Sequence, residues 1–172
     1  MGGFCAIQAP AVCIGDDIDT DLIIAGRYLR TKDAQVWVDH VFEDLDATLH
    51  TRLKGRILVA GKNFGCGSSR EQAAVAIQSA GVQAVIAQSF ARIFFRNAIN
   101  LALPLFEVPD LMCYDGDSIT CSLETGEIMV LNKTEIVATY QAHPLSERML
   151  EIISIGGLLP YVEKRTSSRI IS

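Results

Sequence analysis

The sequence lacks the grouped cysteines and histidines that form disulfide frameworks and metal sites. The five cysteines are scattered along the chain, at Cys5, Cys13, Cys66, Cys113 and Cys121. No two of them form a C-x-x-C pair and no run matches a ferredoxin-type cluster, and the three histidines are equally isolated. Reduced thiols are therefore expected, and no metal site is predicted within this chain.

Positive charge is also scarce. Lys and Arg number 15 against 20 Asp and Glu, so the net charge is −5 and the pI is near 5.1. Such a chain has no basic field to hold a phosphate backbone, and nucleic acid is not expected as a partner. Residues 1–15 lack the basic flank and apolar core of a signal peptide. A cytoplasmic protein that acts on small molecules is predicted.

A membrane span and a second domain are not indicated either. Residues 72–91 carry no charge, but glutamines and serines interrupt them, and a buried helix followed by a buried strand accounts for the stretch. No membrane contact is predicted. There is no internal repeat or linker-like tract, and 172 residues with 49% hydrophobic composition suit one folded unit. A single domain over residues 1–172 is expected.

The middle of the chain alternates buried strands with helices. Short apolar runs at Arg56–Ala60, Ala84–Ala87 and Leu105–Val108 are typical of strands buried on both faces. Between them, residues 73–80 and 94–102 carry apolar side chains at helical spacing. This β-α-β-α-β pattern predicts parallel strands joined by right-handed crossovers.

The flanking segments predict further elements. Residues 4–14 favour a strand, and the aspartate-rich residues 15–21 favour a loop. Alternation at Ser118–Leu123 and Ile128–Leu131, around a Glu-Thr-Gly turn, predicts an antiparallel hairpin. A last amphipathic helix has one apolar face and ends at two glycines; these residues are Leu145, Met149, Ile152, Ile153, Gly156 and Gly157. The predicted fold class is mixed α/β, with a parallel β-α-β-α-β core and added antiparallel strands.

The most informative stretch is Gly61–Glu71, GKNFGCGSSRE, which joins a buried strand to a helix. Ligands bind at the carboxyl ends of strands in open α/β sheets, and helix N-termini attract anions. Ser68, Ser69 and Arg70 offer two hydroxyls and a guanidinium that could hold a carboxylate and stabilise a serine alkoxide. The stretch fits neither a P-loop nor a dinucleotide fingerprint. An anion site is predicted here.

A structural interpretation of the same loop stays open. Ser68 and Glu71 match the S-x-x-E pattern of a helix capping box, which needs no catalytic role. Spacing alone favours this interpretation. The two are compatible, because a residue that caps a helix can also line a site.

Four stretches resemble, in the same order, the small subunits of isopropylmalate isomerase and homoaconitase, members of the aconitase superfamily. They are GDDIDTD at 15–21, YLRT at 28–31, GKNFGCGSSREQA at 61–73 and SFARIFFRNAINLALP at 89–104. The resemblance spans most of the chain and implies a fold similar to the swivelling fourth domain of aconitase. It also implies a hydro-lyase, which moves a hydroxyl between adjacent carbons of a small hydroxy-di- or tricarboxylic acid through an alkene.

The resemblance assigns roles to individual residues. Ser68 matches the family's base that removes the carbon-bound proton, and Asp21 is the second catalytic residue, which supports the loop. Ser69 and Arg70 match residues that grip a substrate carboxylate. Arg30 falls in the loop that the family uses to select the substrate's variable group. A guanidinium there suits an arm that ends in carboxylate, whereas isopropylmalate presents an apolar group.

The resemblance also implies a second polypeptide. The family's [4Fe-4S] cluster needs three cysteine ligands, and this chain offers no such set, so the cluster is expected on a separate large subunit. A heterodimer or heterotetramer in leucine biosynthesis is expected, with no activity from this chain alone. Homoaconitase and dimethylmalate dehydratase subunits are alternatives with the same chemistry. A stand-alone anion-binding regulatory domain is the alternative of a different class.

Overall fold

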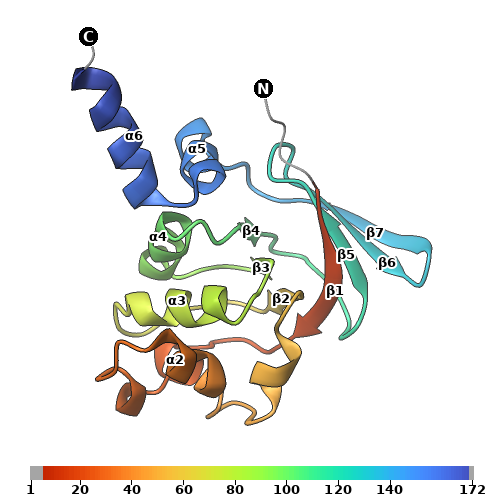
Figure 1. Ribbon diagram of the computed structural model, residues 1–172. Helices are drawn as coiled ribbons and strands as arrows, with labels where there is room; N and C mark the ends of the chain where they lie inside the picture. The colour runs from red at the N-terminus through yellow and green to blue at the C-terminus, as the bar shows by residue number, and fades with distance from the viewer. Residues whose placement is uncertain (1–5, 171–172) are drawn as a thin grey trace.

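A computed structural model describes residues 6–170, which form a seven-stranded mixed sheet in the order β4-β3-β2-β1-β5-β6-β7 (Figure 1). The strands are β1 (Ile7–Cys13), β2 (Ile57–Ala60), β3 (Ala84–Ala87), β4 (Leu105–Glu107), β5 (Ser118–Cys121), β6 (Glu127–Asn132) and β7 (Glu135–Gln141). The pairs β1–β2, β2–β3 and β3–β4 are parallel. The pairs β1–β5, β5–β6 and β6–β7 are antiparallel. The predicted fold class, a parallel core with added antiparallel strands, is what the chain forms.

Helices pack against the parallel half of this sheet, as Figure 1 shows for α2, α3 and α4. The helices are α1 (Thr20–Ile23), α2 (Ala34–His40), α3 (Glu71–Ser79), α4 (Arg92–Asn100), α5 (Glu147–Ile155) and α6 (Leu158–Ile170), with 3₁₀ turns η1 (Gly26–Tyr28) and η2 (Leu49–Arg52). Helices α3 and α4 follow β2 and β3, which confirms the β-α-β-α-β pattern. No helix within residues 6–170 is long and apolar enough to cross a bilayer.

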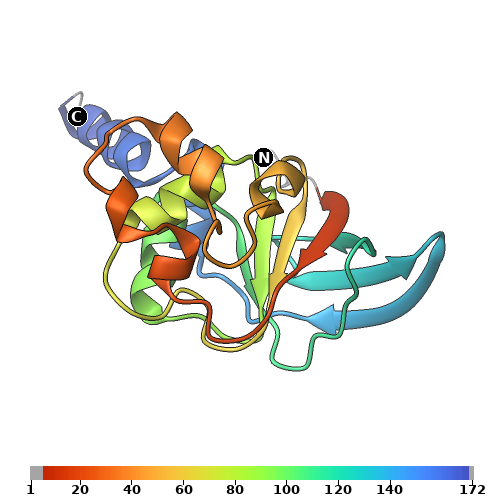
Figure 2. The same ribbon diagram turned by 90° about the horizontal axis from the view of Figure 1, so that it is seen from below.

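The two faces of the parallel strands enter different hydrophobic clusters. Leu58 and Ala60 of β2 pack into the cluster that contains α3, whereas Ile57 and Val59 pack with apolar residues of β5 and β6. Alternate side chains of a strand point to opposite faces, so a fully apolar strand must be covered on both. The antiparallel strands supply the second cover, and Figure 2 shows β6 and β7 projecting away from the helices.

Several predicted boundaries were wrong. The predicted loop at 15–21 ends in α1, because Asp19 Oδ1 accepts a hydrogen bond from Leu22 N at 2.8 Å and caps that helix. The helix predicted over 94–102 ends at Asn100. The strand predicted over 4–14 is observed as β1, and positions 4 and 5 lie outside the described residues.

The last helix and the last strand were not predicted. The helix that ends at Gly156 was expected to be the last, but α6 follows it directly. Likewise, the predicted two-stranded hairpin is extended by a third antiparallel strand, β7.

Candidate active site

The loops that follow β1, β2 and β3 pair with one another by backbone hydrogen bonds. Residues 15–20 run beside residues 61–66, and these run beside residues 88–91, so the parallel arrangement continues past the strand ends. The bonds join Gly61 N to Gly15 O (3.1 Å), Asp17 N to Lys62 O (2.8 Å), Gly65 N to Ile18 O (2.8 Å), Thr20 N to Cys66 O (2.9 Å), Phe64 N to Ser89 O (2.9 Å) and Ala91 N to Phe64 O (2.9 Å). The predicted anion-binding loop therefore lies at the carboxyl edge of the sheet.

Glycines permit this close pairing at two positions. A Cβ on Gly61 would overlap the carboxylate of Asp16. Oδ1 of that carboxylate accepts a hydrogen bond from the backbone N–H of Lys62 at 2.8 Å. Gly65 has a φ of +77°, and a Cβ there would overlap the ring of Phe94. That ring packs edge-on against Phe64, with 5.0 Å between the centroids. Buried aromatic rings thus pack against the glycine loop, and the aspartate-rich loop is hydrogen-bonded alongside it.

Ser68 is held by Thr20, a residue of the other loop. Thr20 Oγ1 donates to the carbonyl oxygen of Ser68 at 3.1 Å and lies 3.4 Å from Ser68 Oγ. Thr20 is buried, with 2% of its surface exposed, whereas Ser68 and Ser69 are exposed. The two serine side chains are therefore accessible from outside the chain.

The predicted capping box is wrong. Helix α3 begins at Glu71, and its N-cap is Arg70 in an extended conformation with no side-chain cap. The backbone at Gly67 has a φ of +91°, and the hydrogen bonds from Thr20 hold residues 66–68 against α1. The chain therefore cannot become helical at residue 69, as a cap at Ser68 would require. The structural interpretation of Ser68 loses its basis.

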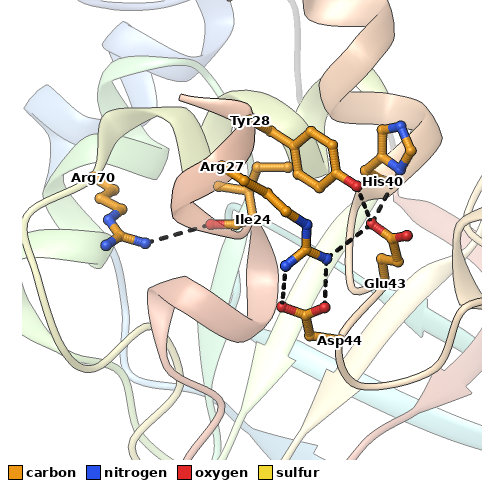
Figure 3. A network of polar contacts seen from close by, with 7 residues as sticks. All are labelled: Ile24, Arg27, Tyr28, His40, Glu43, Asp44 and Arg70. Carbon is orange, nitrogen blue, oxygen red and sulfur yellow. Dashed lines mark hydrogen bonds and ion pairs between the residues drawn. The ribbon is translucent and has the colours of Figure 1, made fainter. Parts of the chain in front are cut away.

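The Arg70 side chain reaches helix α1, where it contacts one residue of the helix and its C-cap. Its Nη1 forms an ion pair with Asp21 Oδ1. The same nitrogen donates to the carbonyl oxygen of Ile24 at 3.5 Å, a contact drawn in Figure 3. The Arg70 side chain is 20% exposed and that of Asp21 is 61% exposed. Solvent screens such a pair, so its main effect is to orient the guanidinium. Asp21, Ser68, Ser69 and Arg70, predicted from distant parts of the sequence, are brought to one place.

Arg30 takes part in none of these contacts and lies in the exposed turn after η1. The structure gives it no hydrogen bond or ion pair within residues 6–170. The beginning of the same segment does reach the site: an ideal Cβ on Gly26 would lie 3.8 Å from Asp21 Oδ1 and 4.0 Å from Arg70 Nη2. Residues 26–30 therefore lead from the Asp21–Arg70 pair to Arg30.

A network of charged groups that sequence reasoning missed anchors this segment (Figure 3). Both terminal nitrogens of the Arg27 guanidinium, Nη1 and Nη2, donate to Asp44, at 3.0 and 2.6 Å. Glu43 Oε2 accepts from Tyr28 Oη at 2.5 Å and from Arg27 Nη2 at 3.2 Å, and lies 3.1 Å from His40 Nδ1. The Tyr28 bond, with Arg27 beside it, lowers the pKa of Glu43 below its ordinary value. The turn that carries Arg30 is thereby fixed to the segment after α2.

This network should loosen in acid. Because the pKa of Glu43 is lowered in the folded chain, its stabilisation is present above the ordinary glutamate pKa and is lost as the pH falls through the lowered pKa. Trp37, the only tryptophan, donates from Nε1 to the Tyr28 carbonyl at 3.0 Å, so its fluorescence reports on this segment. We expect an acid-induced change in emission, which Glu43→Gln should already show at neutral pH.

The exposed residue Glu124, in the turn between β5 and β6, gives the matched control. The tryptophan emission of Glu124→Gln should change with pH as that of the wild type does. Identical emission curves for Glu43→Gln and the wild type would contradict the assigned role of Glu43.

The four cysteines that the structure describes do not fit an iron–sulfur cluster. Cys13 Sγ donates to the Cys113 carbonyl at 3.6 Å, but Cys66 lies in the glycine loop and Cys121 lies in β5. Burial, and then Asp19, raises the pKa of the Cys66 thiol, so it is neutral at physiological pH. Within residues 6–170, no group of three or more His, Cys, Asp or Glu side chains could hold a metal ion. The described residues provide no set of three thiolates for a cluster.

Comparison with known proteins decides the family. The family model of the aconitase C-terminal domain matches residues 17–109, the stretch that holds every predicted site residue. The 3-isopropylmalate dehydratase small subunit of Moorella thermoacetica is 49% identical over 167 residues, covering 95% of this chain and 99% of that protein. This chain belongs to the 3-isopropylmalate dehydratase small-subunit family.

Further members of the dehydratase family agree with this assignment. The small subunit of Thermodesulfovibrio yellowstonii is 47% identical over 156 residues, covering 89% of this chain and 91% of that protein. The crystal structure of 3-isopropylmalate dehydratase from Methanocaldococcus jannaschii superposes with a TM-score of 0.88 at 42% identity, covering 96% of this chain and 98% of that one. Both the resemblance and the swivel-like fold class expected from it are confirmed.

Proposed function

We propose that this chain is the small subunit of an enzyme that interconverts 2-isopropylmalate and 3-isopropylmalate in leucine biosynthesis. One observation carries the proposal: a chain of this family holds Ser68, Ser69 and Arg70 at the carboxyl edge of its sheet, with Asp21 on the guanidinium. Residues 1–172 act as one swivel-like domain in the cytoplasm. A large subunit completes the active site, as a heterodimer or heterotetramer.

Ser68 is the base in this proposal. Its exposed Oγ removes the proton from one carbon of the substrate, and the hydroxyl leaves the neighbouring carbon to give the alkene. The positive end of α3 and the guanidinium of Arg70 stabilise negative charge at this place. Addition of water with the opposite placement of proton and hydroxyl then gives the isomer. Departure of the hydroxyl is assisted by the [4Fe-4S] cluster that the family resemblance implies on the large subunit.

Ser69 and Arg70 hold the substrate. A guanidinium binds a carboxylate through parallel hydrogen bonds, and an adjacent serine hydroxyl can donate a further one. Asp21 acts on the substrate through Arg70, because its carboxylate engages one guanidinium nitrogen and leaves others available. These roles explain why two serines and an arginine, Ser68, Ser69 and Arg70, stand next to each other in the loop after β2.

Arg30 favours a wider substrate range. Its exposed guanidinium has no ion-pair partner within residues 6–170, so it is available to a carboxylate on the substrate's variable arm. Homoaconitate has such an arm, whereas the isopropyl group does not. We therefore propose that the enzyme accepts isopropylmalate while Arg30 turns to solvent, and accepts longer carboxylate-ended substrates as well.

Reconstitution tests the proposed function. The purified chain is assayed for iron and for isopropylmalate turnover, alone and mixed with the large subunit from the same organism. We expect neither iron nor turnover from the chain alone, and turnover upon mixing. Activity of the chain alone would contradict the division of labour. A stable complex that does not turn over isopropylmalate would favour the alternatives with the same chemistry, homoaconitase or dimethylmalate dehydratase. Failure to form a complex would favour a stand-alone anion-binding regulatory domain.

A further inference from the structure

Thr20 stands out because its hydroxyl is a polar group in the core. Among the residues whose burial the structure describes, it is the only serine, threonine, amide or charged residue in the buried class. A buried hydroxyl without a partner is costly, so its contacts indicate what it is for. Those contacts are the Ser68 carbonyl oxygen at 3.1 Å and Ser68 Oγ at 3.4 Å.

The backbone of Thr20 is fastened to the same loop. Its N–H donates to the carbonyl of Cys66 at 2.9 Å, and an ideal Cβ on Gly67 would lie 3.4 Å from Thr20 Oγ1. The hydroxyl therefore has little freedom to move relative to residues 66–68. Only rotation about its own C–O bond remains, and this rotation decides which of the two Ser68 oxygens accepts the hydrogen bond from Thr20.

We propose that Thr20 is the positioning residue for the base, orienting Ser68 Oγ and donating a hydrogen bond to it when it is negatively charged; this rests on the proposed role of Ser68. In the resting chain the Thr20 proton lies on the nearer acceptor, the Ser68 carbonyl. Ser68 then loses its own proton to solvent, to which it is exposed. An alkoxide is a stronger acceptor than a carbonyl, so the Thr20 O–H turns to Ser68 Oγ. The alkoxide then takes the carbon-bound proton of the substrate and becomes a neutral hydroxyl again. The Thr20 O–H turns back and donates its hydrogen bond to the Ser68 carbonyl oxygen.

The test compares Thr20→Val, Thr20→Ala and Thr20→Ser in the complex with the large subunit. Loss of one hydrogen bond to a charged group should lower kcat by about 10- to 100-fold. KM should change little, because Thr20 is buried and does not reach the substrate. Substrate deuterated at the reacting carbon should show a larger isotope effect on kcat in the valine and alanine variants, because proton abstraction has become slower. Serine should restore both values.

Thr51→Val is the matched control, since Thr51 Oγ1 also donates to a backbone carbonyl, that of Thr48 at 2.7 Å, away from the site. It should leave kcat and the isotope effect unchanged. A merely structural role of Thr20 would lower the melting temperature or the fraction of assembled enzyme while the isotope effect stayed constant, and that result overturns the proposal. An inactive wild-type complex would contradict the proposed function and this role with it. An active wild type whose valine and alanine variants match it contradicts the role of Thr20 alone.

Discussion

Replacing Ser68 by alanine should reduce kcat of the assembled enzyme by about 10²–10⁴-fold, the loss typical for a general base. Folding should be almost unaffected. Ser68 is exposed and caps no helix, and the hydrogen bond from Thr20 to its carbonyl oxygen survives the substitution. The measurements are kcat with the large subunit, thermal unfolding of the isolated chain, and assembly of the complex.

The control for this substitution is Ser79→Ala, which removes an exposed hydroxyl at the opposite end of α3. It should match the wild type in all three measurements. A Ser68→Ala chain that unfolds readily, yet keeps full activity per folded molecule, would show that the loop serves stability and would remove Ser68 from the chemistry.

Replacing Arg30 by valine should shift the ratio of kcat/KM values toward isopropylmalate and away from homoaconitate by about 10- to 100-fold. The carboxylate-ended substrate loses one charge-assisted hydrogen bond, which costs roughly 1.5–3 kcal/mol. The isopropyl group meanwhile gains an apolar neighbour in place of a charge that must be kept hydrated. Both substrates are assayed with wild type and variant, each in complex with the large subunit.

Lys32 provides the control, because Lys32→Val removes the same charge from the same exposed segment. General attraction of an anionic substrate would be weakened in both variants, whereas selective contact with the variable arm predicts a changed ratio for Arg30 alone. An unchanged ratio in Arg30→Val would show that Arg30 does not contact that arm.

The parallel core could be predicted because its strands satisfy a strict requirement. Runs such as Ile57–Ala60 are buried on both faces, so each of their residues is apolar and the run is visible in the sequence. Strand β7 could not be found in this way. Most of its residues are exposed, and the apolar Ile136 and Val137 are neighbours that point to opposite faces, so apolar and polar side chains do not alternate cleanly along it.

Helix α6 was missed for a similar reason. Gly156 and Gly157 were taken as the end of the last helix, and Pro160 stands soon after them. Proline is tolerated in the first turn of a helix, where its missing N–H has no partner to lose, and α6 begins at Leu158. The signal that stops one helix therefore did not exclude another directly behind it.

The site residues were predicted from a resemblance, but the contacts among them were not. The hydrogen bond from Thr20 to Ser68 joins positions 48 apart, and Arg70 meets Asp21 across 49. Local spacing instead suggested the capping box at Ser68, because the sequence pattern takes no account of a second loop that holds residues 66–68 out of the helix. Sequence patterns within one segment cannot show which other segment lies against it.

The two parts of the site are fastened in different ways. Backbone hydrogen bonds tie residues 15–20 to residues 61–66, and these bonds do not depend on which side chains the loops carry. Side-chain contacts, chiefly Arg27 with Glu43 and Asp44, anchor the segment that leads to Arg30. Under the roles proposed above, residues 29–32 can therefore change, and with them the substrates accepted, without displacing the oxygen of Ser68.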